Sequence, residues 1–181
     1  MKNLTYAMKE FFRNYFKLNG RLSRAGYWWA FLGYLIIAII CSILNVVLDT
    51  GIFTTVLQIA TFIPWFTATA RRYHDCGRST GFLVLMYVLE GVFGFIIFGS
   101  LVGIIFGAYF ESGGIFGGSL IATGVGAIGM LTVAIISFIG LVKPSVPGEN
   151  KWGAPEPFDP DKDDKAETAV IEKSDDVSSE Q

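Results

Sequence analysis

Residues 28–48 read WWAFLGYLIIAIICSILNVVL and contain no Asp, Glu, Lys, Arg or His. A helix of about 20 apolar residues crosses the hydrocarbon core of a bilayer. The stretch begins with two tryptophans, which favour the interface between membrane and water. It therefore predicts a membrane span that starts at a membrane surface, and it indicates an integral membrane protein.

Three further apolar stretches follow this first one. We expect spans at about 52–70, 81–108 and 119–142, with a tight turn at 49–51 and a connector at 109–118. Pro64 should kink the second span and free a backbone carbonyl for another partner. Of the 181 residues 52% are hydrophobic and only 17% are charged, against about 25% charged in soluble domains. The predicted fold class is an all-α polytopic membrane protein, with four transmembrane helices in a compact bundle (26–142).

The N-terminal segment, residues 1–25, is basic and amphipathic. Over residues 3–18 the apolar side chains fall on one helical face and most charged ones on the other. Such a helix can lie in the interface of an anionic leaflet, or its apolar face can pack against the transmembrane helices. We expect an amphipathic interfacial helix, and both arrangements of its apolar face remain open. A cleavable signal peptide is not expected, because no short apolar stretch with a small-residue cleavage site follows the basic residues.

Lysines and arginines alternate between the connections. Residues 1–25 carry six, residues 71–78 carry three, and the connections at 49–51 and 109–118 carry none. Because cytoplasmic loops are enriched in these residues, both termini and residues 71–78 should be cytoplasmic. A Gly/Pro-rich cytoplasmic segment (143–159) should follow the last span. Residues 160–181 are acidic and poor in large apolar groups, so a disordered tail is expected.

The stretch RRYHDCGRS, residues 71–79, concentrates charge between two apolar runs. His74 and Cys76 are too few for a metal site, which takes three or four ligands. A Cys/His nucleophile pair needs spatial adjacency and an orienting group, and a phosphate loop needs a strand before it. We therefore expect no catalytic residue, metal or cofactor. The arginines should instead anchor the ends of two helices, Asp75 should pair with an arginine, and the loop should turn at its glycine.

Two features of the third span are unusual. Glu90 lies about 13 Å inside the membrane if the helix starts near residue 81, so it should face the bundle, be protonated or have a partner. Ion or proton passage is the functional alternative to a hydrogen-bonded core glutamate. Gly99, Gly103 and Gly107 are spaced by four, and Gly126 lies in the next span. Such spacing favours close helix packing within the chain, with homo-oligomerisation as a second use.

Three motifs together resemble the bacterial inner-membrane family called domain of unknown function 805. They are GRLSRAGYWW (20–29), RRYHDCGRS (71–79) and PGENKWGAPEP (147–157). The matching residues are Arg21, Ser23, Arg24, Tyr27, Trp28, Arg71, Arg72, His74, Asp75, Gly77, Arg78, Ser79, Gly148, Asn150, Trp152, Gly153 and Pro155. Family members often continue the middle motif with Gly-Trp, whereas this chain continues with Thr80, Gly81 and Phe82. The resemblance covers roughly residues 10–157 and implies a compact four-helix membrane protein without an assigned reaction.

We expect the three motifs to meet at the cytoplasmic face as one polar cluster that stabilises the fold or binds an anionic ligand, lipid or partner. Its candidate residues are Arg21, Ser23, Arg24, Arg71, Arg72, His74, Asp75, Arg78 and Asn150. His74 should be mostly neutral there. The alternatives are a small transporter or channel that uses Glu90 and the glycine-lined third span, and a membrane enzyme acting on lipid headgroups. The expected partners are anionic membrane lipids. Nucleic acid is not expected, and no protein partner is indicated.

Overall fold

The computed structural model describes residues 1–161, and every regular element in them is an α-helix. The helices are α1 (Lys2–Arg13), α2 (Arg24–Val47), α3 (Ile52–Asp75), α4 (Thr80–Tyr109) and α5 (Gly113–Val142). Helices α2 to α5 are each long and apolar enough to cross a membrane. The prediction of an all-α protein with four spans is confirmed. The acidic tail predicted from residue 160 lies, after its first two residues, outside the described part of the chain.

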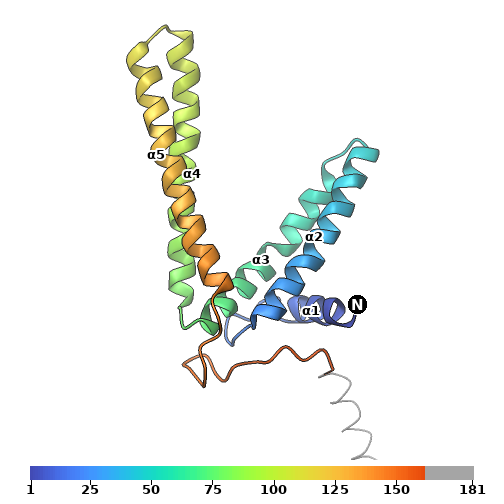
Figure 1. The fold of residues 1–181 in the computed structure, drawn as a ribbon. Coiled ribbons are helices and arrows are strands. Elements are labelled where there is room, and N and C mark those ends of the chain that lie inside the picture. The colour runs from blue at the N-terminus through green and yellow to red at the C-terminus, as the bar shows by residue number, and fades with distance from the viewer. Residues whose placement is uncertain (162–181) are drawn as a thin grey trace, which may run out of the picture.

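The four long helices form two hairpins, α2 with α3 and α4 with α5 (Figure 1). The hairpins meet at one end and diverge towards their turns, so the molecule has the shape of a V. We call the shared end the base and the two turns the tips. Short helix α1 lies across the lower part of α2. Away from the base, the facing sides of the hairpins are separated.

Helices α4 and α5 pack closely along their length. A methyl group placed on Gly107 would lie 2.6 Å from the backbone nitrogen of Phe116, and one on Gly126 would lie 2.8 Å from Ile97. Gly103 likewise faces Ser119. Small residues on these faces let the two backbones approach. Gly99, which the same spacing placed on this face, has no neighbouring atom within 4 Å of such a methyl group.

The connector between α4 and α5 is shorter than expected. Residues 113–118, assigned to the connector by their glycines, are the first turns of α5. Their helical conformation is stabilised by tertiary packing, because α4 runs directly beside them at Gly107. Closer to the base, a hydrogen bond of 2.7 Å joins the hydroxyls of Ser100 and Thr123. Packing thus overrides the low helix propensity of glycine.

Helix α1 packs its apolar face on the other helices, which decides between the two arrangements left open by its pattern. Ala7 and Phe11 form a buried cluster with Ala30 of α2 and Ala68 of α3. The helix ends at Arg13, earlier than the periodicity over 3–18 predicts. At this end the backbone N–H and the side chain of Asn14 both donate to the carbonyl of Glu10, at 3.1 and 2.8 Å.

Pro64 lies inside α3, and the helix continues through it. Because proline has no N–H, the carbonyl four residues earlier, that of Ala60, loses its helical donor. The hydroxyl of Tyr15 donates to this carbonyl at 2.9 Å. The freed carbonyl therefore has a partner, and this bond ties the segment after α1 to α3.

Candidate functional site

Residues Arg71–Asp75 form the last turn of α3, so the expectation of a loop there was wrong. The helix ends in a Schellman motif, in which Gly77 has φ +79° and the N–H of Arg78 donates 2.9 Å to the carbonyl of Tyr73. The hydroxyl of Ser79 then caps the first turn of α4. Because the turn between α3 and α4 is short, the charged side chains stay at the base. Their hydrogen bonds to other segments there stabilise residues 71–75 in the helical conformation.

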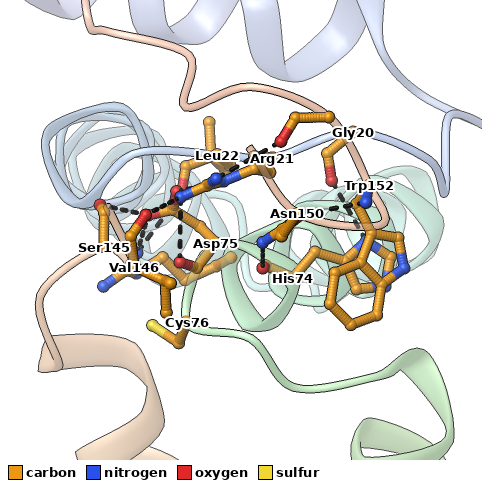
Figure 2. Close-up of polar contacts among 12 residues, drawn as sticks. Gly20, Arg21, Leu22, His74, Asp75, Cys76, Ser145, Val146, Asn150 and Trp152 are labelled. Atoms are coloured by element: carbon orange, nitrogen blue, oxygen red, sulfur yellow. Dashed lines mark hydrogen bonds and ion pairs between the residues drawn. The ribbon is translucent and has the colours of Figure 1, made fainter. Parts of the chain in front are cut away.

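Asp75 lies at the centre of a buried ion-pair network (Figure 2). Its Oδ1 accepts a hydrogen bond from Arg21 Nε at 2.9 Å, and its Oδ2 accepts one from Arg72 Nη1 at 2.5 Å. The hydroxyl of Ser145 also donates to Oδ2. The side chains of both arginines are 0% exposed, and that of Asp75 is 2% exposed. Both carboxylate oxygens are therefore occupied by donors from this chain.

Most of the remaining donors of the two arginines bind backbone carbonyls at the end of α5 and in the segment after it. Arg21 donates from Nη2 to Val146 at 2.6 Å and from Nη1 to Gly148 at 2.7 Å. Arg72 donates from Nε to Leu141 at 2.9 Å. Charge-assisted bonds of this kind are the stronger hydrogen bonds of proteins. The two arginines thus hold the chain that leaves α5 against the end of α3.

His74 is buried beside this network and both of its ring nitrogens are used. Nδ1 donates to the carbonyl of Gly20 at 3.1 Å, and Nε2 lies 2.8 Å from the hydroxyl of Thr80. Since a carbonyl can only accept, Nδ1 carries a proton, and in the neutral ring Nε2 accepts from the threonine. Trp152 stacks on the imidazole with centroids 4.3 Å apart, and Asn150 Nδ2 donates 3.0 Å to the His74 carbonyl (Figure 2).

The structure brings the three sequence motifs together in what we call the basal cluster. Its members are Arg21, Arg72, His74, Asp75, Ser145 and Asn150. Ser23 lies next to it, where its hydroxyl accepts 3.2 Å from the Gly26 N–H and caps α2. The cluster is a filled hydrogen-bond network, in which both carboxylate oxygens of Asp75 and both ring nitrogens of His74 have partners from this chain.

Three of the candidate arginines do not pair with Asp75. Arg71 is 4% exposed, and its Nε donates weakly, at 3.4 Å, to the carbonyl of Thr67. The guanidinium of Arg78 lies 4.3 Å above the ring of Phe82. Arg24 is exposed and has no hydrogen bond or ion pair within residues 1–161. The positive charge of these arginines at the base is therefore not neutralised by the one negative charge of Asp75.

His74 and Cys76 do not form a nucleophile–base pair. The thiol of Cys76 donates to the carbonyl of Gly140 at 3.3 Å, whereas the histidine nitrogens have the partners described above. Burial raises the pKa of the Cys76 thiol, which disfavours the reactive thiolate. Within residues 1–161, no group of three or more His, Cys, Asp or Glu side chains could hold a metal ion.

Glu90 lies on the face of α4 that carries the buried residues Leu83 and Met86. Its own side chain is half-buried. In the part of the chain that the structure describes, it has no hydrogen bond or ion pair. The other acidic residue within the four long helices is Asp75, which belongs to the basal cluster. No second acid therefore faces Glu90 in these helices.

Several contributors to the basal cluster were not predicted from the sequence. Ser145 follows the last span, 70 positions from Asp75, and no local signal marks it as a partner. Trp152 belongs to a recognised motif, but its stacking on His74 was not predicted. The backbone carbonyls that accept from the arginines carry no signal in a sequence.

A comparison with known families matches residues 15–154 to the family described as "Protein of unknown function (DUF805)". The chain belongs to this family. It is also similar to "Inner membrane protein YhaH" of Escherichia coli (strain K12), with 32% identity over 82 residues that cover 42% of this chain and 68% of that protein. The same values hold for the protein of that name in Escherichia coli O157:H7. No solved structure matches the chain significantly.

The family match confirms the resemblance that the three motifs indicated. Together with the four apolar helices, the similarity to inner-membrane proteins identifies this family member as a multi-pass protein of the bacterial inner membrane. The family description carries no reaction, so function has to be argued from the geometry of the base.

Proposed function

We propose that this protein is a non-enzymatic inner-membrane protein in which the basal cluster acts as a latch on the cytoplasmic side. The latch fixes the angle between the two helical hairpins and thereby maintains the V shape of the molecule. Its role is to maintain this open arrangement in the membrane, and the cluster itself takes no substrate.

One observation carries the proposal: a single carboxylate receives donors from two distant segments as well as from its own helix. Asp75 at the end of α3 binds Arg21, which precedes α2, and Ser145, which follows α5. Tyr73, in the same turn of α3, donates 3.3 Å to the carbonyl of Ser137 in α5. A ring contact between Trp28 of α2 and Phe138 of α5 also lies low on the hairpins, with centroids 6.2 Å apart. Contacts between the hairpins are thus concentrated near the latch.

The cytoplasmic placement rests on the alternation of basic residues. The segments at the base, 1–25 and 71–78, carry six and three lysines and arginines, and the two tips carry none. Positive residues favour the cytoplasmic side. Both termini and the latch would then be cytoplasmic, and both tips would face the opposite side.

The proposal predicts that breaking the latch changes the angle between the hairpins. Spin labels at Thr50→Cys and Ser112→Cys, in the full chain with both native cysteines replaced by serine, would report the tip-to-tip distance by pulsed electron paramagnetic resonance. Asp75→Asn should broaden or shift the distance distribution in lipid nanodiscs, because an uncharged amide cannot hold two guanidinium groups.

Glu149→Gln is the matched control, since Glu149 is an exposed acid at the base outside the network. It should leave the distance unchanged. An unchanged, narrow distribution in Asp75→Asn, or equal changes in both variants, would contradict the latch.

A further inference from the structure

A cleft lies just above the base, between the lower ends of α2 and α5. It has a volume of about 520 Å³ and is lined by Arg24, Ala25, Trp28, Trp29, Leu32 and Val142. We propose that this cleft binds one anionic phospholipid, with the lipid phosphate at Arg24 and the acyl chains along α2. The proposal does not depend on the latch, because none of the lining residues belongs to the basal cluster.

The lining residues of α2 follow the order of polarity within a phospholipid. Arg24, Trp28 and Leu32 are spaced by four, so they lie on one face of the helix and rise by about 6 Å at each step. The guanidinium lies at the base, the indole one turn higher and the aliphatic side chain one turn beyond. A phospholipid presents its phosphate, its glycerol esters and its acyl chains in the same order, and indoles favour the ester level.

The apolar part of this face continues along α2. Leu35, Ile39 and Ile43 extend the stripe, are 42%, 53% and 56% exposed, and line a second hollow of about 500 Å³. From Arg24 to Ile43 the helix rises by about 28 Å. The hydrocarbon core of a bilayer is about 30 Å thick. The stripe is therefore long enough to contact an extended acyl chain through one leaflet and continues into the other leaflet.

The charge at the mouth of the cleft favours an anionic lipid. Arg24 is exposed and has no counter-ion in residues 1–161, and it lies near enough to Arg72 for the two charges to repel. Lys143, directly after Val142, is also exposed. The nearby network holds two arginines against the single carboxylate of Asp75. A phosphate at Arg24 would reduce this excess positive charge.

The walls of the cleft favour a lipid over free phosphate. Four of the six lining residues are large and apolar (Trp28, Trp29, Leu32 and Val142). Free phosphate would contact only Arg24 and leave these surfaces in water, whereas acyl chains would cover them. A second copy of the chain would cover the apolar walls but would bring no defined anion to Arg24.

The test uses the full chain in a non-ionic detergent, titrated with phosphatidylglycerol that carries bromine on its acyl chains. Bromine quenches tryptophan fluorescence at short range, so binding in the cleft should quench Trp28 and Trp29. We expect tighter binding of brominated phosphatidylglycerol than of brominated phosphatidylcholine. Arg24→Gln should weaken the phosphatidylglycerol titration about fivefold, the effect of one basic residue at an anionic surface, and leave phosphatidylcholine unchanged.

Lys151→Gln is the matched control. Lys151 is an exposed cation at the base, 4.2 Å from the ring of Trp152 and outside the cleft. Its loss should leave the titration unchanged, and replacing both Trp28 and Trp29 by Phe should remove most of the quenching. Two further variants serve if Arg24→Gln does not fold. Arg24→Lys should keep the preference for phosphatidylglycerol, and Leu32→Trp, which fills the cleft, should weaken binding.

Four results would overturn the proposal. They are equal quenching by the two lipids, equal weakening in Arg24→Gln and Lys151→Gln, and unchanged binding in Leu32→Trp. The fourth is displacement of the lipid by inorganic phosphate at matched ionic strength, which would mean that Arg24 binds phosphate without regard to the acyl chains.

Discussion

Arg21 and Asp75 are 54 positions apart in the chain, and their side chains form a buried ion pair with Nε 2.9 Å from Oδ1. Arg21 precedes the first long helix, and Asp75 ends the second. The pair therefore closes the α2–α3 hairpin at its base. Through Arg72 and Ser145, the same carboxylate extends this closure to the segment after α5.

The first prediction concerns the free energy of unfolding of this network. Asp75→Asn should cost about 3–5 kcal/mol, because it leaves buried arginines without their counter-ion. In double-mutant cycles, the effect of Asp75→Asn should be strongly non-additive with Arg21→Gln and with Arg72→Gln. Denaturation with sodium dodecyl sulfate in mixed micelles, followed by circular dichroism, would measure each variant.

Arg71→Gln provides the control for these cycles. Arg71 is equally buried and adjacent in sequence to Arg72, but it has no bond to Asp75. Its effect should add to that of Asp75→Asn. Non-additivity of similar size for Arg71 would show a general response to lost charge and contradict a network of defined pairs.

The second prediction concerns packing between α4 and α5. Gly107→Ala should destabilise the protein by about 1–3 kcal/mol, the usual cost of overpacking. The added methyl group would lie 2.6 Å from the backbone nitrogen of Phe116, which cannot rotate away. Gly99→Ala, in the same helix but facing open space, should be neutral or stabilising by up to about 1 kcal/mol. Equal losses in the two variants would refute this assignment of faces.

The third prediction concerns topology and thiol reactivity. In intact cells, an impermeant maleimide should label Thr50→Cys and Ser112→Cys and should miss Lys151→Cys, each in a chain without other cysteines. Labelling of Lys151→Cys alone would mean that the orientation is reversed. Native Cys76 does not serve this purpose, because its 6% exposure makes it inert on either side of the membrane.

Cys76 itself should react slowly even in opened membranes at neutral pH. Burial raises the pKa of its thiol, so the reactive thiolate is scarce until the pH is raised well above the ordinary range of cysteine. Unfolding in sodium dodecyl sulfate should expose the thiol and allow rapid labelling. Rapid labelling of the folded protein at pH 7 would show that the base is more open than the structure has it.

The fourth prediction concerns Glu90. Glu90→Gln should change the free energy of unfolding by less than about 0.5 kcal/mol, because the carboxyl has no partner to lose in the described residues. Glu90→Lys should cost about 2.5–3.5 kcal/mol, the cost of placing a lysine near the centre of a spanning helix. Glu111→Lys, at the α4–α5 tip, is the control and should be tolerated. Equal tolerance of both lysine variants in the denaturation assay would place Glu90 in water.

The sequence alone determined the class of the protein and the number of its long helices. Uninterrupted apolar runs and the grouping of basic residues are local properties, and in a membrane each helix satisfies its backbone hydrogen bonds within itself. Because the grouping of basic residues can be read from the sequence, the three motifs could be assigned to one side of the membrane. The helical start of α5 was missed because glycine has low intrinsic propensity, and only packing against α4 reverses that preference.

Tertiary structure alone decided which side chains meet at the base. Of five arginines in the motifs, Arg21 and Arg72 bind Asp75, whereas Arg24, Arg71 and Arg78 have other surroundings. Composition does not distinguish them, because a buried ion pair depends on atomic distances between segments that are remote in the chain. The same holds for the V between the hairpins. An apolar helix face can contact either lipid or another helix, and the sequence does not distinguish the two. The packing at the base decides which faces of the hairpins contact each other and which face the membrane.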